Sequence, residues 1–116
     1  MKKNLMVLTL ISLMLVPGSQ VFAHPPADIT LQFDPETQTL SAVIIHPVNN
    51  PKSHYIKRVD IGLNGKEIDD RKYQVQENGR EQSLTVTLPE AKAGDTLSVE
   101  GYCNLSGKLK KEIKIS

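Results

Sequence analysis

The chain has 116 residues, of which 39% are hydrophobic and 23% are charged, with 14 basic residues against 13 acidic ones. This length leaves room for one small domain, and a net charge near zero provides no electrostatic footprint for nucleic acid or anionic lipid. With three Tyr, two Phe and no Trp, the chain is also a poor candidate for stacking bases or sugars.

Residues 1–23 have the features of a secretory signal peptide. Lys2 and Lys3 form a basic start, residues 5–16 form an apolar run, and the small residue Ala23 fits a cleavage site. The run is too short to span a membrane, and no second run follows. We therefore expect an exported mature domain, residues 24–116, that is periplasmic or secreted and has no membrane anchor. Cleavage would leave 12 basic residues against 13 acidic ones.

Apolar and polar residues alternate along most of the mature chain, whereas helical periodicity is missing. Turn-forming dipeptides such as Asn64-Gly65 separate the alternating segments. The expected strands, in chain order, are 29–33, 40–46, 56–63, 73–76, 84–88, 96–103 and 110–115. Asp69-Asp70 is interpreted as a polar turn. About seven short strands with regular turns predict an all-β fold, an immunoglobulin-like antiparallel β-sandwich.

The only cysteine and the three histidines are the residues with the clearest chemistry. His46 ends one predicted strand, His54 precedes the next, Cys103 ends another, and His24 would begin the mature chain. Strand ends are where a rigid sandwich usually places its ligands, and imidazole and thiolate are donors for transition metals. An unpaired cysteine in an oxidising compartment is open to oxidation unless it is buried or bound. The alternatives are exposed loop histidines and a cysteine that is buried as a small hydrophobic residue.

These residues resemble the motifs of the superoxide reductase family, which includes neelaredoxin and the iron domain of desulfoferrodoxin. The resemblance covers about residues 43–115 and is carried by His46-Pro47, His54-Tyr55-Ile56, Tyr102-Cys103-Asn104-Leu105 and Gly107. In that family, four histidines and a cysteine thiolate trans to an open position hold ferrous iron, which reduces superoxide to peroxide. The resemblance implies that His46, His54 and Cys103 are metal ligands. His24 matches the first ligand of the family through the sequence His24-Pro25-Pro26.

The chain departs from the family pattern in three places. Ser106 stands where the family's Cys-Asn-X-His turn has its fourth histidine, so one nitrogen ligand is lost. The segment between His46 and His54 is longer than usual. No Glu-Lys pair precedes the first histidine, which leaves Lys52 as the candidate residue for attracting superoxide.

The predicted cleavage site offers a replacement for the lost histidine. Cleavage after Ala23 would give His24 a free α-amine, whose pKa near 8 leaves it available for coordination near neutral pH. We hypothesise that this amine and the Nδ1 atom of His24 chelate the metal together. Three imidazoles, one amine and one thiolate would then restore four nitrogens and one sulfur. The alternative is that His24-Pro25-Pro26 is a frayed terminus.

The sequence therefore predicts an exported mononuclear iron protein that reduces superoxide with electrons from an external donor protein. The main alternative is a periplasmic protein that handles copper or zinc without catalysis, because the same donors suit both metals. A blue-copper carrier lacks its usual axial ligand, since Met1, Met6 and Met14 all precede the cleavage site. A structural module with incidental histidines is the third possibility. The oligomeric state stays open.

Overall fold

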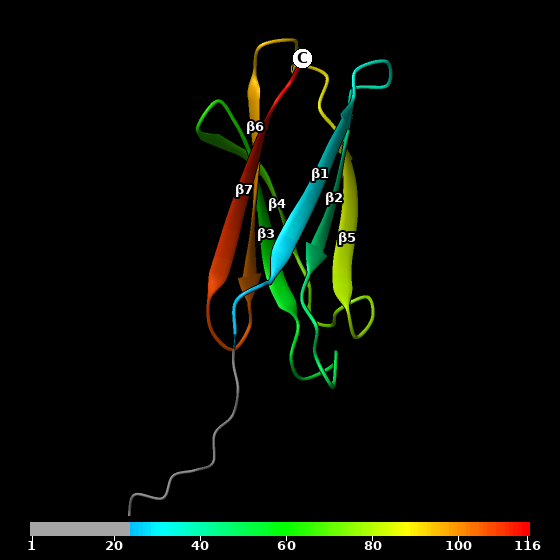
Figure 1. Ribbon diagram of the computed structural model, residues 1–116, viewed down its shortest axis with the longest axis vertical. Helices are drawn as coiled ribbons and strands as arrows, with labels where there is room; N and C mark the ends of the chain where they lie inside the picture. Colours follow the sequence, from blue (N-terminus) through cyan, green and yellow to red (C-terminus); the bar gives the residue numbers. More distant parts are fainter. Residues whose placement is uncertain (1–23) are drawn as a thin grey trace, which may run out of the picture.

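The computed structural model describes residues 24–116, which form seven β-strands (Figure 1). The predicted signal peptide, residues 1–23, lies outside the described residues. In chain order the strands are β1 (Asp28–Asp34), β2 (Thr39–Ile45), β3 (Ile56–Leu63), β4 (Lys66–Lys72), β5 (Glu81–Thr87), β6 (Thr96–Cys103) and β7 (Lys108–Lys114). Over residues 24–116, no helix is long and apolar enough to cross a membrane.

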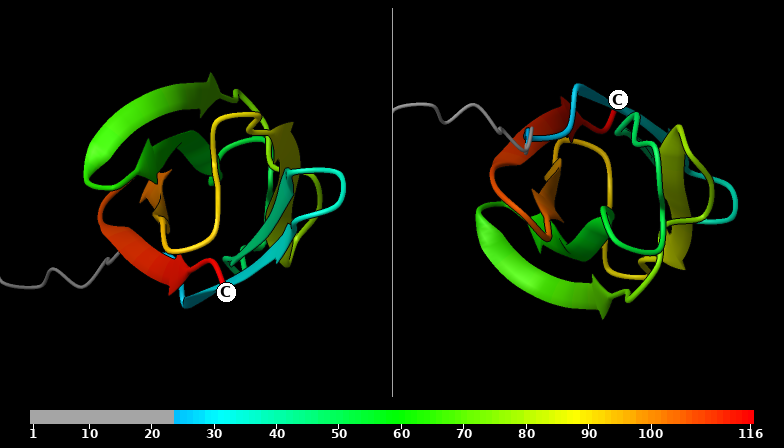
Figure 2. Two further views of the ribbon diagram at one scale, coloured as in Figure 1. Left: turned by 90° about the horizontal axis from the view of Figure 1, so that it is seen from above. Right: turned by 90° about the horizontal axis from the view of Figure 1, so that it is seen from below.

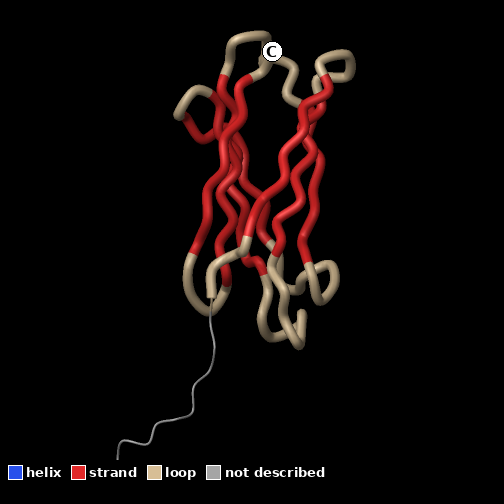
Figure 3. Tube along the Cα trace, in the orientation of Figure 1, coloured by secondary structure: helices blue, strands red, loops and turns tan. Residues whose placement is uncertain are grey.

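The strands are arranged in two sheets that face each other. One sheet has the order β1-β2-β5 and the other β4-β3-β6-β7, and all strand pairs are antiparallel. Figure 2, which looks along the long axis of the molecule, shows the two sheets as facing layers. The buried hydrophobic residues of both sheets form one core cluster. Figure 3 shows that the segments between strands are loops gathered at the two ends of the sandwich. The predicted all-β, immunoglobulin-like sandwich is confirmed.

The core explains which side chains reach the end of the sandwich. Along β2, residues Leu40, Ala42 and Ile44 point inward and are buried, and His46 continues this alternation one step beyond the strand. Along β6, buried residues at positions 97, 99 and 101 lead in the same way to Cys103. His46 and Cys103 therefore both extend the inward-facing rows of their sheets.

The structure corrects the prediction of a polar turn at Asp69-Asp70, because these residues belong to β4. Asn64 and Gly65 both have positive φ, 51° and 86°, so β3 turns back at once into β4. β4 is an edge strand whose charged side chains are exposed or half-buried. They form ion pairs with Arg58 of β3 or with one another along the strand. An edge strand without an apolar row gives no alternation signal in the sequence.

The prediction of a strand at residues 73–76 is wrong, because this segment belongs to a loop between β4 and β5. Its backbone bonds to other loop segments: the Gln76 N–H donates to the Pro51 carbonyl at 3.0 Å. Later in the same loop, the carbonyl of Arg80 accepts from the N–H of His46 at 2.8 Å. The loop thus closes the end of the sandwich at which β2 ends and β3 begins. The other six predicted strands coincide with observed strands to within three residues at each end.

Candidate metal site

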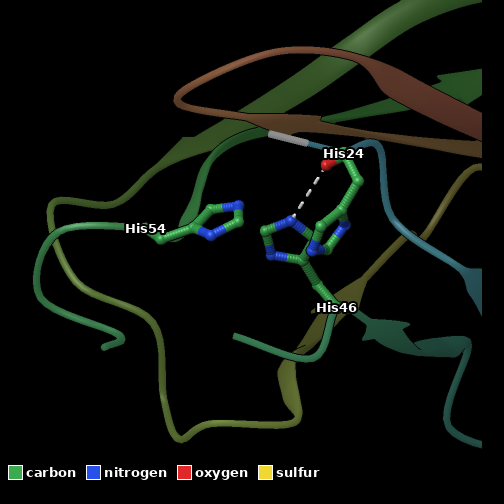
Figure 4. A group of neighbouring side chains, drawn as sticks. All are labelled: His24, His46 and His54. Atoms are coloured by element: carbon green, nitrogen blue, oxygen red, sulfur yellow. Dashed lines mark hydrogen bonds between the residues drawn. The ribbon is translucent and has the colours of Figure 1, made fainter. Parts of the chain in front are cut away.

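Three histidines from separate segments meet at this end of the sandwich (Figure 4). His24 precedes β1, His46 follows β2, and His54 precedes β3. One ring nitrogen of each lies within 4.8 Å of the corresponding nitrogen of the other two. The ring centroids are 4.9 Å apart for His24–His46 and His24–His54, and 4.8 Å for His46–His54. We call this group the three-histidine cluster.

His46 is completely buried, and each of its ring nitrogens has an oxygen atom nearby. Its Nδ1 atom lies 2.8 Å from Oε1 of Gln76, and its Nε2 atom lies 3.3 Å from the carbonyl oxygen of His24. Pro47 directly follows and has no backbone N–H, so the β-ladder stops at this point. The ring therefore sits at a fixed place at the end of the core.

His54 carries the one buried side-chain nitrogen or oxygen in residues 24–116 that has no hydrogen-bond partner, its Nε2 atom. Buried polar atoms almost always have a hydrogen-bond partner. An unpartnered one either binds a ligand or lowers the stability of the fold by the free energy of its desolvation. Burial, followed by the positive charges of His46 and His24, lowers the pKa of His54. The neutral imidazole is the form that binds metals.

His24 is positioned by contacts of the two prolines and the alanine that follow it. The Ala27 N–H donates to the Ile45 carbonyl at 2.7 Å, which extends the β1–β2 pairing toward the site. Pro25 lies against Gly107, in the turn after β6. The segment is therefore packed against both sheets, which argues against the frayed terminus considered from the sequence.

Cys103 is buried at the same end of the core, and its turn is tied to the residue beside His54. Asn104 exchanges two bonds with Tyr55: its N–H donates to the Tyr55 carbonyl at 2.9 Å, and its Oδ1 accepts from the Tyr55 N–H at 2.8 Å. The Leu105 N–H donates to the Sγ atom of Cys103 at 3.4 Å. Cys103 is not a member of the group of ligand atoms that lie within 4.8 Å of one another.

Two further residues from the sequence analysis lie near the surface. Ser106 is exposed in the turn after Cys103. Lys52 is exposed in the loop between β2 and β3 and does not line the shallow pocket of about 240 Å³ beside the cluster. That pocket is lined by His24, Pro47, Val48, Asn49, His54 and Gly79. The pocket gives a small molecule access to two of the three histidines.

Sequence reasoning missed Gln76, the hydrogen-bond partner of His46. The side chain is buried, although it belongs to a polar loop 30 residues away from His46 in the sequence. A single glutamine between Val75 and Glu77 carries no sequence signal, because its importance comes from a contact between distant segments.

The three-histidine cluster fits a transition-metal ion. Three imidazoles are a common donor set for zinc, copper and iron, and the buried Nε2 atom of His54 has no hydrogen-bond partner within the protein. A second group, Asp60, Glu67 and Asp70, also brings ligand atoms within 4.8 Å of one another. Its carboxylates already form ion pairs with Arg58.

Comparisons with known proteins agree with this fold. No protein-family model matches the chain, and no curated protein matches it. Among solved structures, superoxide reductase (neelaredoxin) from Ignicoccus hospitalis is similar, with 20% sequence identity, a TM-score of 0.50, and coverage of 80% of this chain and 81% of that chain. Two variants of the same protein match at 18% and 17% identity, with TM-scores of 0.47 and 0.48. The chain thus has the sandwich fold of superoxide reductase, as the sequence resemblance implies.

Proposed function

We propose that this protein is an exported mononuclear iron protein that reduces superoxide to peroxide at the three-histidine cluster. The observation that carries the proposal is the convergence of three histidines around a buried, unpartnered Nε2 atom of His54. This convergence occurs in a fold shared with superoxide reductase. Cys103, which lies buried at the same end of the core, is proposed as the thiolate ligand.

An iron ion held by these residues would supply one electron to each superoxide, two protons would come from water, and an external donor protein would return the electron. His24, His46 and His54 would hold the ion in place. As a thiolate ligand, Cys103 would add negative charge to the site, and its Sγ atom accepts from the Leu105 N–H. The pocket beside His24 and His54 is large enough for a diatomic anion to enter from solvent. Lys52 would act only by long-range attraction, because it does not line this pocket.

The second candidate is a protein that binds copper or zinc without catalysis. Two observations favour it: Ser106 replaces the fourth histidine of the family pattern, and the group of close ligand atoms contains three histidines without Cys103. Three imidazoles and one open position are the donor set of many zinc sites. Both candidate functions use the three-histidine cluster, but they predict different bound metals.

The two candidates can be separated by two measurements, metal content and visible absorption. Both are made on protein that its host has exported and processed. Intact mass first shows whether the chain begins at His24. About one iron per chain, with a thiolate-to-metal absorption band that is lost in Cys103→Ser and with superoxide consumption, supports the first proposal. Copper or zinc at the same stoichiometry, without superoxide consumption, supports the second. A protein that takes up none of these metals on titration contradicts both.

A further inference from the structure

We infer that Gln76 is a positioning residue that determines which nitrogen of His46 is free to bind the metal. The inference rests on the proposed metal site, but its central test needs no metal. Gln76 is 2% exposed and lies between the segments that carry His46 and His54. It is not itself a candidate ligand and would act through the segments that carry His46 and His54.

The hydrogen bonds of the Gln76 amide fix its orientation. Its Nε2 atom donates to two backbone carbonyls, those of His46 at 2.8 Å and Asn78 at 2.9 Å. Its Oε1 atom accepts from the backbone N–H of Ile56 at 3.1 Å. A flipped amide would place its oxygen against two carbonyl oxygens and its NH₂ group against an N–H, so only one orientation satisfies all three backbone groups.

This orientation fixes the hydrogen on the His46 ring. The Nδ1 atom of His46 lies 2.8 Å from Oε1 of Gln76, which can only accept, so Nδ1 must carry a hydrogen. Nε2 is then the nitrogen that gives up its hydrogen when His46 is neutral. It lies 3.3 Å from the carbonyl oxygen of His24 (Figure 4), which offers no hydrogen in return. The lone pair of Nε2 is therefore the one that His46 can give to a metal ion.

The same amide sets the spacing between two candidate ligands. Gln76 binds both the carbonyl and the ring of His46, and it also binds the N–H of Ile56, two residues after His54. It therefore ties the end of β2, in one sheet, to the start of β3, in the other. Partners of this kind behind a metal ligand typically change metal affinity by about 10- to 100-fold.

The test compares Gln76→Met with the wild-type chain, because methionine has a similar length but its thioether sulfur is only a weak acceptor for the His46 ring. Long-range ¹H–¹⁵N NMR of the metal-free protein should show His46 with its hydrogen on Nδ1 in the wild type. Gln76→Met should shift hydrogen to Nε2, and zinc affinity, measured by chelator competition, should fall about 10- to 100-fold.

Gln82→Met is the matched control. Gln82 is also buried, accepts from the Glu77 N–H at 2.9 Å and donates to the Ser83 carbonyl at 3.2 Å, with no bond to a histidine. Gln82→Met should lower the free energy of unfolding but leave the His46 tautomer and the zinc affinity unchanged. If Gln76→Met behaves like Gln82→Met, Gln76 is merely structural and the inference is overturned.

Gln76→Glu keeps the inference testable if Gln76→Met does not fold. A glutamate retains the acceptor for His46 and Ile56 but loses the two donor bonds, so the hydrogen should stay on Nδ1 of His46. A His46 ring with no hydrogen on Nδ1 in this variant, or in the wild type, would overturn the inference. Wild-type protein that binds no metal, yet has the expected tautomer, would reject the proposed function while leaving the role of Gln76 intact.

Discussion

Pro25 and Gly107 pack so closely that a Cβ atom added to Gly107 would lie 2.8 Å from the Cβ atom of Pro25. Gly107 also has a φ of 90°, a conformation that residues with a side chain rarely adopt. The contact joins the segment that carries His24 to the turn that follows Cys103. Because of this contact, a shift of the turn after Cys103 would also move the segment that carries His24.

Gly107→Ala should weaken both stability and metal binding. The positive φ alone should cost about 1 to 3 kcal/mol of the free energy of unfolding. The clash should in addition push Pro25, and with it His24, away from the other histidines. Urea unfolding and zinc titration measure the two effects.

Gly94→Ala is the control for this variant. Gly94 has a nearly identical φ of 91°, but a Cβ atom there would meet no atom within 4 Å. It should lose stability through strain but keep its metal affinity. Equal metal affinity in the two variants would show that the Pro25 contact does not position His24.

His54 and His46 should respond differently to leucine. His54→Leu removes a buried nitrogen that has no partner, a group whose burial typically costs about 1 to 3 kcal/mol, so the metal-free protein should be as stable or more stable. His46→Leu removes a ring bonded to Gln76 and should destabilise the metal-free protein. Both variants should lose the rise in melting temperature that metal produces in the wild type. A destabilised metal-free His54→Leu would speak against a preformed ligand nitrogen.

Ser106→His tests the alignment of the turn after Cys103 with the family pattern. The substitution restores the missing imidazole in an exposed position, where it should cause little strain. If Ser106 occupies the position of the fourth ligand, the visible spectrum should change and superoxide consumption should rise. Leu105→His, one residue earlier, is the control and should leave both unchanged. An unaltered spectrum in Ser106→His would reject the alignment.

An added residue at the N-terminus tests the proposed α-amine ligand. A mature chain that begins at His24 should bind metal more tightly than one with a glycine before His24, because the added residue converts the amine into an amide. The effect should appear as a change in the spectrum and in the number of protons released on binding. Identical spectra and affinities for the two chains would remove the amine from the site.

Asp95, between β5 and β6, should make stability depend on pH in the acid range. A hydrogen bond from Asn64, followed by a backbone hydrogen bond from Lys92, lowers its pKa below the usual 3.8. A carboxyl group whose pKa is lower in the folded state stabilises the fold at any pH above its unfolded-state pKa. This stabilisation is lost as the pH falls through the folded-state pKa. Asp95→Asn should therefore flatten the decline in stability below about pH 4. A decline as steep as in the wild type would assign the effect to other carboxylates.

The sandwich fold and the positions of the residues with metal-binding chemistry could be predicted from local sequence patterns. The strands 56–63 and 96–103 and the turn at Asn64-Gly65 were predicted correctly, because period-two alternation and tight-turn chemistry are local properties. The same alternation brings His46 and Cys103 to inward-facing strand ends. The export signal stays a prediction.

Which of these residues lie close together depends on the packing of segments that are distant in the sequence. The three-histidine cluster requires segments on β1 and β2 of one sheet to face the start of β3 in the other, and no local pattern encodes that juxtaposition. Gln76 and β4 escaped prediction for the same reason: the importance of a buried amide or an edge strand lies in its distant partners. The pattern of apolar residues determines which segments form strands and which faces are buried. A binding site depends in addition on how these segments pack against one another.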